Sequence, residues 1–265
     1  MVMRFRPLSI LTVALLSLGV SAYADQWSKQ WTTGPSPELR VETGDGSVVV
    51  TGTPYNNRIE ARVITNGWKI GPSDVRIDEH FDNNRLELTV HVPAVHFSIG
   101  NRSVRIELRV PQSIASTIHT GDGSINLEDL KGMTRLTTGD GSITALGMDG
   151  TIEARTGDGA VKIRGRFDGV QVHTKDGSVN LQATAGSKMV GTWRLESGDG
   201  SVTLSVPGDL AADVEAHTGD GHISFDLPVT LSDKKSEHDV RGRINGGGAS
   251  LIVRTGDGSI TIAKS

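Results

Sequence analysis

The stretch Thr138-Gly139-Asp140-Gly141-Ser142-Ile143 decides the fold, because the chain repeats it again and again. Eight copies occur, four of them identical over Thr-Gly-Asp-Gly-Ser, and they begin at Thr43, Thr120, Thr138, Thr156, Thr174, Ser197, Thr218 and Thr255. The aspartates of successive copies are 77, 18, 18, 18, 23, 21 and 37 residues apart. Self-similarity at a short period indicates a solenoid, in which one supersecondary unit stacks on its own copies.

Apolar and polar residues alternate on both sides of each copy. Four positions before the aspartate and five positions after it stand apolar residues, with mostly polar residues between the apolar positions. Three positions after the aspartate every residue is β-branched: Val48, Ile125, Ile143, Val161, Val179, Val202, Ile223 and Ile260. A period of two around a glycine-rich break predicts a strand, a turn and a second strand that share one buried face.

The 18-residue step fixes how these strands connect. A helical crossover between parallel strands needs more chain than this, whereas two strands of about five residues and two short turns fill it. The second turn is visible at Met148–Gly150 and Phe167–Gly169. We therefore predict an all-β fold, a right-handed parallel β-helix or β-roll solenoid with coils of 18–23 residues, each stacked on the coil before it. Glycines at the corners are expected to supply positive φ.

The chain divides into three parts. Residues 1–24 are interpreted as a signal peptide and residues 25–38 as a leader or linker, although Trp27 and Trp31 favour a cap over the end of the solenoid. Residues 39–265 form one β-solenoid domain, with an irregular β cap over 39–115 and repeated coils over 116–265. Within the cap, alternation on either side of Asp82-Asn83-Asn84 predicts an antiparallel hairpin. Residues 228–248 are interpreted as a solvated connection before the last coil.

The N-terminal segment has the pattern of a cleaved secretory signal. Arg4 and Arg6 precede an apolar run over Leu8–Val20, and Ala22-Tyr23-Ala24 offers small residues for cleavage. The run is too short to span a bilayer comfortably, so no membrane span is expected after cleavage. The chain has no cysteine, which excludes a disulfide and a lipid anchor of the bacterial lipoprotein kind. An exported monomer is predicted, in the periplasm, on the cell surface or outside the cell.

Charge argues against two classes of partner. Of the 27 Lys and Arg residues, two lie in the signal, and the remaining 25 face 31 Asp and Glu residues. The sequence shows no run of basic residues, so neither nucleic acid nor an anionic membrane is expected as a partner.

The aspartate column leaves two alternatives. Carboxylates in adjacent coils would lie about 4.8 Å apart, so each must be hydrated, hydrogen-bonded in its own turn or bridged by a cation. An Asx-turn, with the carboxylate accepting the amide two residues on, needs no ligand. A calcium ladder would need six to eight oxygens per ion, while each coil offers one carboxylate. The structural alternative is favoured, and no metal or cofactor is predicted. The column is Asp45, Asp122, Asp140, Asp158, Asp176, Asp199, Asp220 and Asp257.

No catalytic constellation emerges from the sequence. His119, His173 and His217 share one column, but the mixture of residues there is typical of a solvated face rather than a zinc site. Gly219-Asp220-Gly221-His222 faintly resembles pieces of β-helical pectin hydrolases, without the further acids and the basic residue those enzymes need. We assign no catalytic, cofactor-binding or metal-binding residue.

The repeats, together with Ile106-Glu107-Leu108-Arg109-Val110-Pro111 and the last copy at Thr255–Ile262, resemble a bacterial adhesin-like domain family of exported β-solenoid proteins of unknown function. The resemblance implies adhesion by analogy and carries no catalytic residues. We therefore predict a non-catalytic exported adhesin or envelope scaffold that binds an unknown surface ligand, either a polysaccharide or a protein. The alternative is a β-helix carbohydrate-active enzyme, a polysaccharide lyase or hydrolase. A cleft with two convergent carboxylates beside an Arg or Lys would favour that alternative.

Overall fold

The computed structural model describes residues 24–54, 57–93 and 102–265. All regular structure in these ranges is β-strand, so the predicted all-β class is confirmed. Within the part of the chain so described, nothing helical has the length and apolar character needed to cross a membrane. The predicted signal peptide lies outside the described residues except for Ala24.

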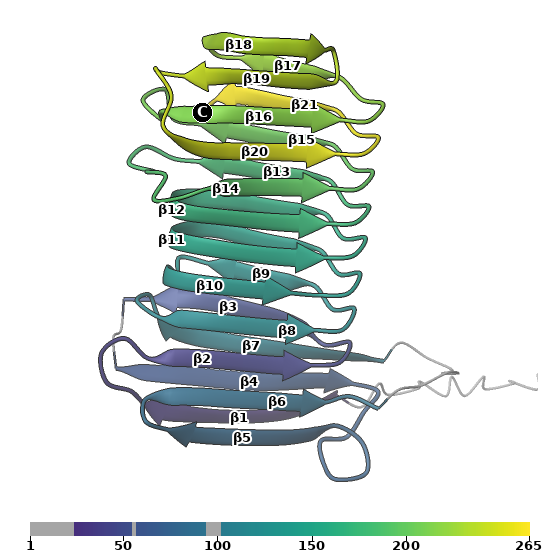
Figure 1. Ribbon diagram of the computed structural model, residues 1–265. Coiled ribbons are helices and arrows are strands. Elements are labelled where there is room, and N and C mark those ends of the chain that lie inside the picture. The colour runs from purple at the N-terminus through teal and green to yellow at the C-terminus, as the bar shows by residue number, and fades with distance from the viewer. Residues whose placement is uncertain (1–23, 55–56, 94–101) are drawn as a thin grey trace, which may run out of the picture.

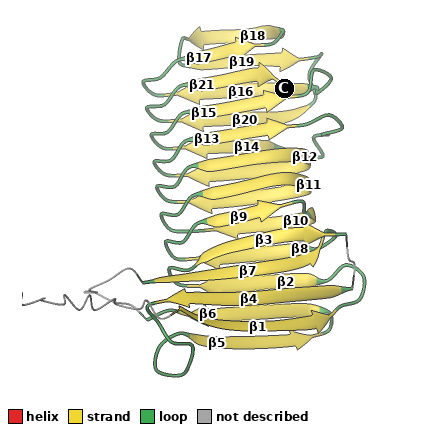
Figure 2. Cartoon of the chain, turned by 180° about the vertical axis from the view of Figure 1, so that it is seen from behind, coloured by secondary structure: helices red, strands yellow, loops and turns green. Residues whose placement is uncertain are grey.

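The strands form an elongated stack with two sheet-like faces, which the Thr-Gly-Asp-Gly turns join along one side (Figures 1 and 2). We call the face whose coil strands run into these turns the leading face and the face whose coil strands follow them the trailing face. Along the stack the leading face contains β5 (Arg76–Asp82), β6 (Arg85–His91), β2 (Glu38–Thr43), β8 (Ala115–Thr120), β10 (Lys131–Thr137), the second halves of β11 (Ile143–Thr156) and β12 (Val161–Thr174), β14 (Trp193–Ser197), β20 (Ala249–Thr255), β16 (Ala212–Thr218), β19 (Asp239–Ile244) and β18 (Val229–Ser236). The trailing face contains β1 (Ala24–Thr32), β4 (Arg58–Asn66), β7 (Ser103–Pro111), β3 (Ser47–Thr53), β9 (Ile125–Glu128), the first halves of β11 and β12, β13 (Val179–Ala183), β15 (Val202–Val206), β21 (Ile260–Lys264) and β17 (Ile223–Asp226).

The coils pair in parallel and bury one ladder of side chains per column. Ile143 pairs with Val161, which pairs with Val179, and none of the three is more than 1% exposed. This stacked ladder is confirmed, and burial of each such side chain contributes about 1.5–3 kcal/mol. In a different column, six positions before the aspartate, the hydroxyl of Ser116 donates to that of Thr134 over 3.2 Å inside the core. The right-handed sense of the winding stays a prediction.

The order of the coils differs from the prediction at both ends of the chain. The first coil, β2 and β3, lies between β6–β7 and β8–β9 instead of at the start of the stack. The last coil, β20 and β21, lies between β14–β15 and β16–β17. Coils therefore stack in chain order only in the middle. The physical reason is that every coil offers similar strand edges for parallel pairing, so a coil does not pair preferentially with the coil that is next to it in sequence.

Antiparallel strands terminate the stack at the N-terminal side. The predicted hairpin is present as β5 and β6, and both Asn83 and Asn84 have positive φ at its turn. The predicted leader contains β1, which pairs antiparallel with β4 and turns Trp31 into the core. Segment 25–38 is thus largely a strand of the sheet rather than a linker, because its alternate residues have a core to cover.

The opposite end is closed in a similar way on the leading face. Residues 228–248 were expected to form a solvated connection, and this expectation is wrong. They supply the hairpin of β18 and β19, in which β19 pairs antiparallel with β16 and buries Val240 and Ile244. Burial of these two side chains explains why this segment is ordered as strands.

Candidate functional site

The threonine column of the repeated turns is structural. The buried hydroxyl of Thr138 donates to the carbonyl oxygens of Gly121 and Gly123 in the neighbouring turn, at 3.0 and 2.9 Å. The equivalent contact with the neighbouring turn recurs at Thr120, Thr156, Thr174, Ser197, Thr218 and Thr255. At the first turn the buried Thr43 Oγ1 has no partner among the described residues, because the ladder of such turns ends there.

The glycines of these turns serve close stacking rather than positive φ. None of them has φ in the left-handed region, so the prediction of positive φ is wrong for this corner. The prediction of positive φ is confirmed for Gly150, in the second turn of the coil, whose φ is 130°. In the repeated turn, a Cβ added at Gly159 would lie 2.0 Å from the carbonyl oxygen of Gly141. A side chain there is excluded by the backbone of the neighbouring coil.

The aspartate column lies outside these contacts. All eight carboxylates are exposed, and none accepts the turn amide that an Asx-turn would require. The threonine or serine takes that role instead, as when the Gly177 amide donates to Thr174 Oγ1 over 3.1 Å. The Asx-turn interpretation is therefore wrong. Among the described residues Asp176 alone in the column has an ion pair, with Lys175 at 3.6 Å. No group of three or more His, Asp or Glu side chains that could hold a metal ion occurs in the described ranges.

The histidine column does not converge either. His119, His173 and His217 are exposed on the leading face, in strands that are not neighbours in the stack. His173 lies 3.7 Å from Glu196, inside a hollow of about 260 Å³ that also contains Glu153 and Arg194. Hydrogen bonding from Arg135, with the nearby charge of Arg155, holds the pKa of Glu153 below its usual range. A lowered pKa is the opposite of what a general acid requires.

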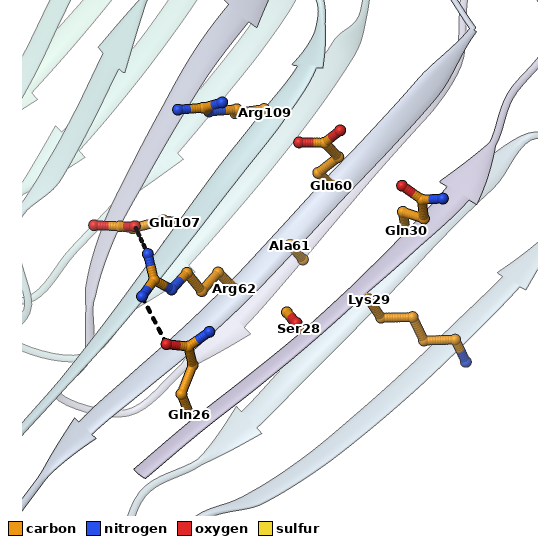
Figure 3. A pocket seen from close by; sticks show the side chains of 9 residues that line it. All are labelled: Gln26, Ser28, Lys29, Gln30, Glu60, Ala61, Arg62, Glu107 and Arg109. Carbon is orange, nitrogen blue, oxygen red and sulfur yellow. Dashed lines mark hydrogen bonds and ion pairs between the residues drawn. The ribbon is translucent and has the colours of Figure 1, made fainter. Parts of the chain in front are cut away.

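A larger hollow of about 610 Å³ lies on the outer surface of β1, β4 and β7 (Figure 3). Alternation places Gln26, Ser28 and Gln30 of β1 on this surface, and the small Ser28 lies opposite Arg62 of β4. Arg62 donates to Gln26 Oε1 over 2.6 Å and lies 4.0 Å from Glu107 of β7, as the dashed lines in Figure 3 mark. The hollow is thus an open, polar depression on a three-stranded surface.

Two copies of one motif supply four of the five charged residues of the hollow, and Lys29 of β1, which pairs with Glu79, is the fifth. Arg58-Ile59-Glu60-Ala61-Arg62 in β4 and Arg105-Ile106-Glu107-Leu108-Arg109 in β7 run antiparallel, with Glu60 opposite Arg109 and Arg62 opposite Glu107. In each motif the first arginine holds the central glutamate, Arg58 to Glu60 at 2.9 Å and Arg105 to Glu107 at 2.8 Å. Four arginines thus face two glutamates. The guanidinium of Arg109, which also lines the hollow, makes no ion pair or hydrogen bond with any described residue.

This cluster was missed by the sequence reasoning, which found no basic run. The two motifs are 47 residues apart, and alternation places a buried residue after every charged one, so neither reads as a basic stretch. The repeated Arg-x-Glu-x-Arg pattern was the signal that could have pointed to it. Its convergence needs the antiparallel pairing of β4 with β7, which the sequence pattern did not predict.

Comparison with solved structures finds matches of low sequence identity. The solved structure named "putative cell adhesion protein" from Clostridium sporogenes is 15% identical, with a TM-score of 0.44 over 91% of this chain and 100% of that chain. A "putative lipid binding protein" from Parabacteroides distasonis is 12% identical, with a TM-score of 0.44 over 91% and 97%. A "putative adhesin" from Parabacteroides merdae is 11% identical, with a TM-score of 0.40 over 91% and 97%.

No curated protein is significantly similar to the chain. The family model described as Toastrack DUF4097 matches residues 37–263, which contain every strand except β1 and the last residue of β21. The chain therefore belongs to the Toastrack DUF4097 family.

Proposed function

We propose that the chain is a non-catalytic exported binding protein, an adhesin or envelope scaffold, that holds an acidic polysaccharide in the hollow on β1, β4 and β7. The observation that carries this proposal is the guanidinium of Arg109, which lines the hollow and is unpaired among the described residues, while Glu60 and Glu107 are already held by the first arginine of their own motif. The N-terminal signal pattern supports export, to the periplasm, the cell surface or the medium.

The chemistry suits carboxylate or sulfate groups on a chain. A guanidinium donates two parallel hydrogen bonds to a planar or tetrahedral anion and is only weakly hydrated. The arginines project from strands fixed on both sides by backbone pairing, so little backbone conformational entropy is lost on binding. Because the surface is open, single contacts are weak and screened by salt, and affinity must come from several sugar residues at once.

The test compares two exposed arginines of the trailing face. Arg109→Gln removes the unpaired guanidinium from the hollow, while Arg164→Gln removes an exposed guanidinium of β12 that lies outside it. The probes are polygalacturonate, dextran sulfate and neutral dextran, immobilised and titrated with the mature protein. We expect both anionic chains and not neutral dextran to bind. Arg109→Gln should weaken binding about fivefold, since one exposed charged contact is worth about 1 kcal/mol.

Three results would contradict the proposal. They are equal binding to neutral dextran, no loss between about 50 and 500 mM salt, and an equal loss in Arg164→Gln. The two anionic probes separate carboxylate from sulfate recognition.

One observation favours the alternative, a carbohydrate-active enzyme: Glu60 and Glu107 share the hollow with Arg62 and Arg109. Each carboxylate is, however, engaged by the first arginine of its own motif, so neither is free to attack or to donate a proton. Release of reducing or unsaturated ends from polygalacturonate that is lost in both Glu60→Gln and Glu107→Gln would establish this alternative instead.

A further inference from the structure

The last coil of the chain occupies a slot between two coils that precede it in sequence. β20 pairs in parallel with β14 on one side and β16 on the other, and β21 does the same with β15 and β17. Residues 207–211 connect β15 to β16 across this slot. The slot has room for one strand on each face, which is β20 on the leading face and β21 on the trailing face. Residues 249–265 thus fill a gap that the rest of the chain leaves open.

The slot holds this coil by contacts that any coil of identical sequence would make. Thr255 Oγ1 donates to the carbonyl of Gly200 over 2.8 Å, and Thr218 Oγ1 donates to that of Gly258 over 2.7 Å. Leu251 and Ile262 are fully buried. A second copy of the chain carries the same coil, so its insertion would restore every one of these contacts.

A single short connection over residues 245–248 joins this coil to β19. This connection crosses the end of β16, because β19 and β20 lie on opposite sides of that strand.

In the monomer, the connection over residues 245–248 requires an unusual backbone conformation. Asn245, Gly246 and Gly247 have φ of 48°, 87° and 90°, three successive residues in the left-handed region. A non-glycine residue there is held at a cost of about 1 kcal/mol or more. The Asn245 amide offsets part of this by donating to the carbonyls of Gly208 and Leu210, both at 2.8 Å. Short connections under such strain favour exchange of the segment they tether.

We propose that two copies of this chain join by exchanging residues 249–265, each copy's last coil filling the other's slot. The exchanged dimer has the contacts of two monomers with two extended connections in place of two closed ones. Its population is then set by chain concentration and by the strain at Asn245 in the monomer. This proposal is independent of the ligand proposed for the hollow on β1, β4 and β7.

Because the chain has no cysteine, engineered ones report the exchange directly. Thr203 of β15 and Thr261 of β21 are registered neighbours that point outward. Chains carrying Thr203→Cys alone and chains carrying Thr261→Cys alone are mixed, refolded together at a series of concentrations, diluted and then oxidised. A disulfide between the two chains forms at this pair only when β21 of one lies beside β15 of the other. The control pairs Thr203→Cys with Thr51→Cys of β3, an outward position in a distant coil.

We expect covalent dimers from the first mixture, in a proportion that rises with concentration during refolding, and none above background from the control. Gly246→Val, which disfavours positive φ, should raise the dimer fraction, and three residues inserted after Gly246 should lower it. Melting curves of each single variant confirm that it folds. Absence of cross-chain disulfides at every concentration, with and without Gly246→Val, would overturn the proposal, and so would equal yields from the control mixture.

Discussion

Substitution of the second glycine in a repeated turn tests the close stacking most directly. In Gly159→Ala the new Cβ would lie 2.0 Å from the carbonyl oxygen and 2.5 Å from the carbonyl carbon of Gly141. An ordinary carbon–oxygen contact needs about 3.4 Å, so the two coils must separate by more than 1 Å at this corner. The atoms in the way belong to backbone, which cannot rotate aside.

The cost follows from what that separation breaks. Overpacking of this kind costs about 1–3 kcal/mol. The hydrogen bonds from Thr156 to Gly139 and Gly141, at 3.2 and 2.9 Å, stretch beyond use and add about 1 kcal/mol each. We expect a total of about 3–5 kcal/mol, which for a chain of this size lowers the melting temperature by about 10 °C.

The assay is urea and thermal unfolding followed by tryptophan fluorescence, with Gly157→Ala as the matched control. At Gly157 the Cβ would meet the Gly139 oxygen at 2.7 Å and the movable Asp140 side chain at 3.0 Å. The chain already carries Lys175 at the equivalent place of the next turn, so this position tolerates a side chain. Gly159→Ala should therefore cost at least twice as much as Gly157→Ala. Equal stability of the two variants, or of Gly159→Ala and the parent, would refute the stacking argument.

Three further predictions concern charge. Asp140→Asn with Asp158→Asn should raise the melting temperature slightly at low ionic strength, an effect that salt removes, and calcium should stabilise the parent no more than magnesium does at matched ionic strength; a calcium-specific rise lost in the double variant would contradict this. Hydrogen bonds from Arg166 hold the pKa of Asp168 below its ordinary value. This pair therefore stabilises the fold above about pH 4, and its contribution is lost as the pH falls through the lowered pKa. Arg166→Gln should make the free energy of unfolding depend less on pH in the acid range, and an unchanged dependence would count against the pair. Val161→Asp places an unpaired carboxylate between buried neighbours and should cost several kcal/mol in urea unfolding, so a variant that unfolds like the parent would argue against the buried ladder.

The local patterns of this chain determine its coils. Alternation around each Thr-Gly-Asp-Gly turn specifies two strands with one buried face, and the 18-residue step specifies parallel stacking, as the pairing of Ile143 with Val161 confirms. These features follow from residues close in sequence, and so could be predicted without the structure. The role of the turn glycines could not be predicted in this way, because the atom that excludes their Cβ belongs to the neighbouring coil of the stack.

The order of the coils and the position of the hollow depend on tertiary structure. Every coil offers nearly the same edges, so nothing local tells β20 to lie between β14 and β16 rather than beyond β16. That choice depends on the β18–β19 hairpin, which covers the far side of β16 and leaves the slot as the open place. In the same way, Arg62 and Arg109 line one hollow only because β4 pairs antiparallel with β7. The repeats are therefore enough to predict the strand–turn–strand unit of each coil, but they do not predict the order in which the coils stack. Nearly identical strand edges pair equally well, and the connections between the coils select one partner.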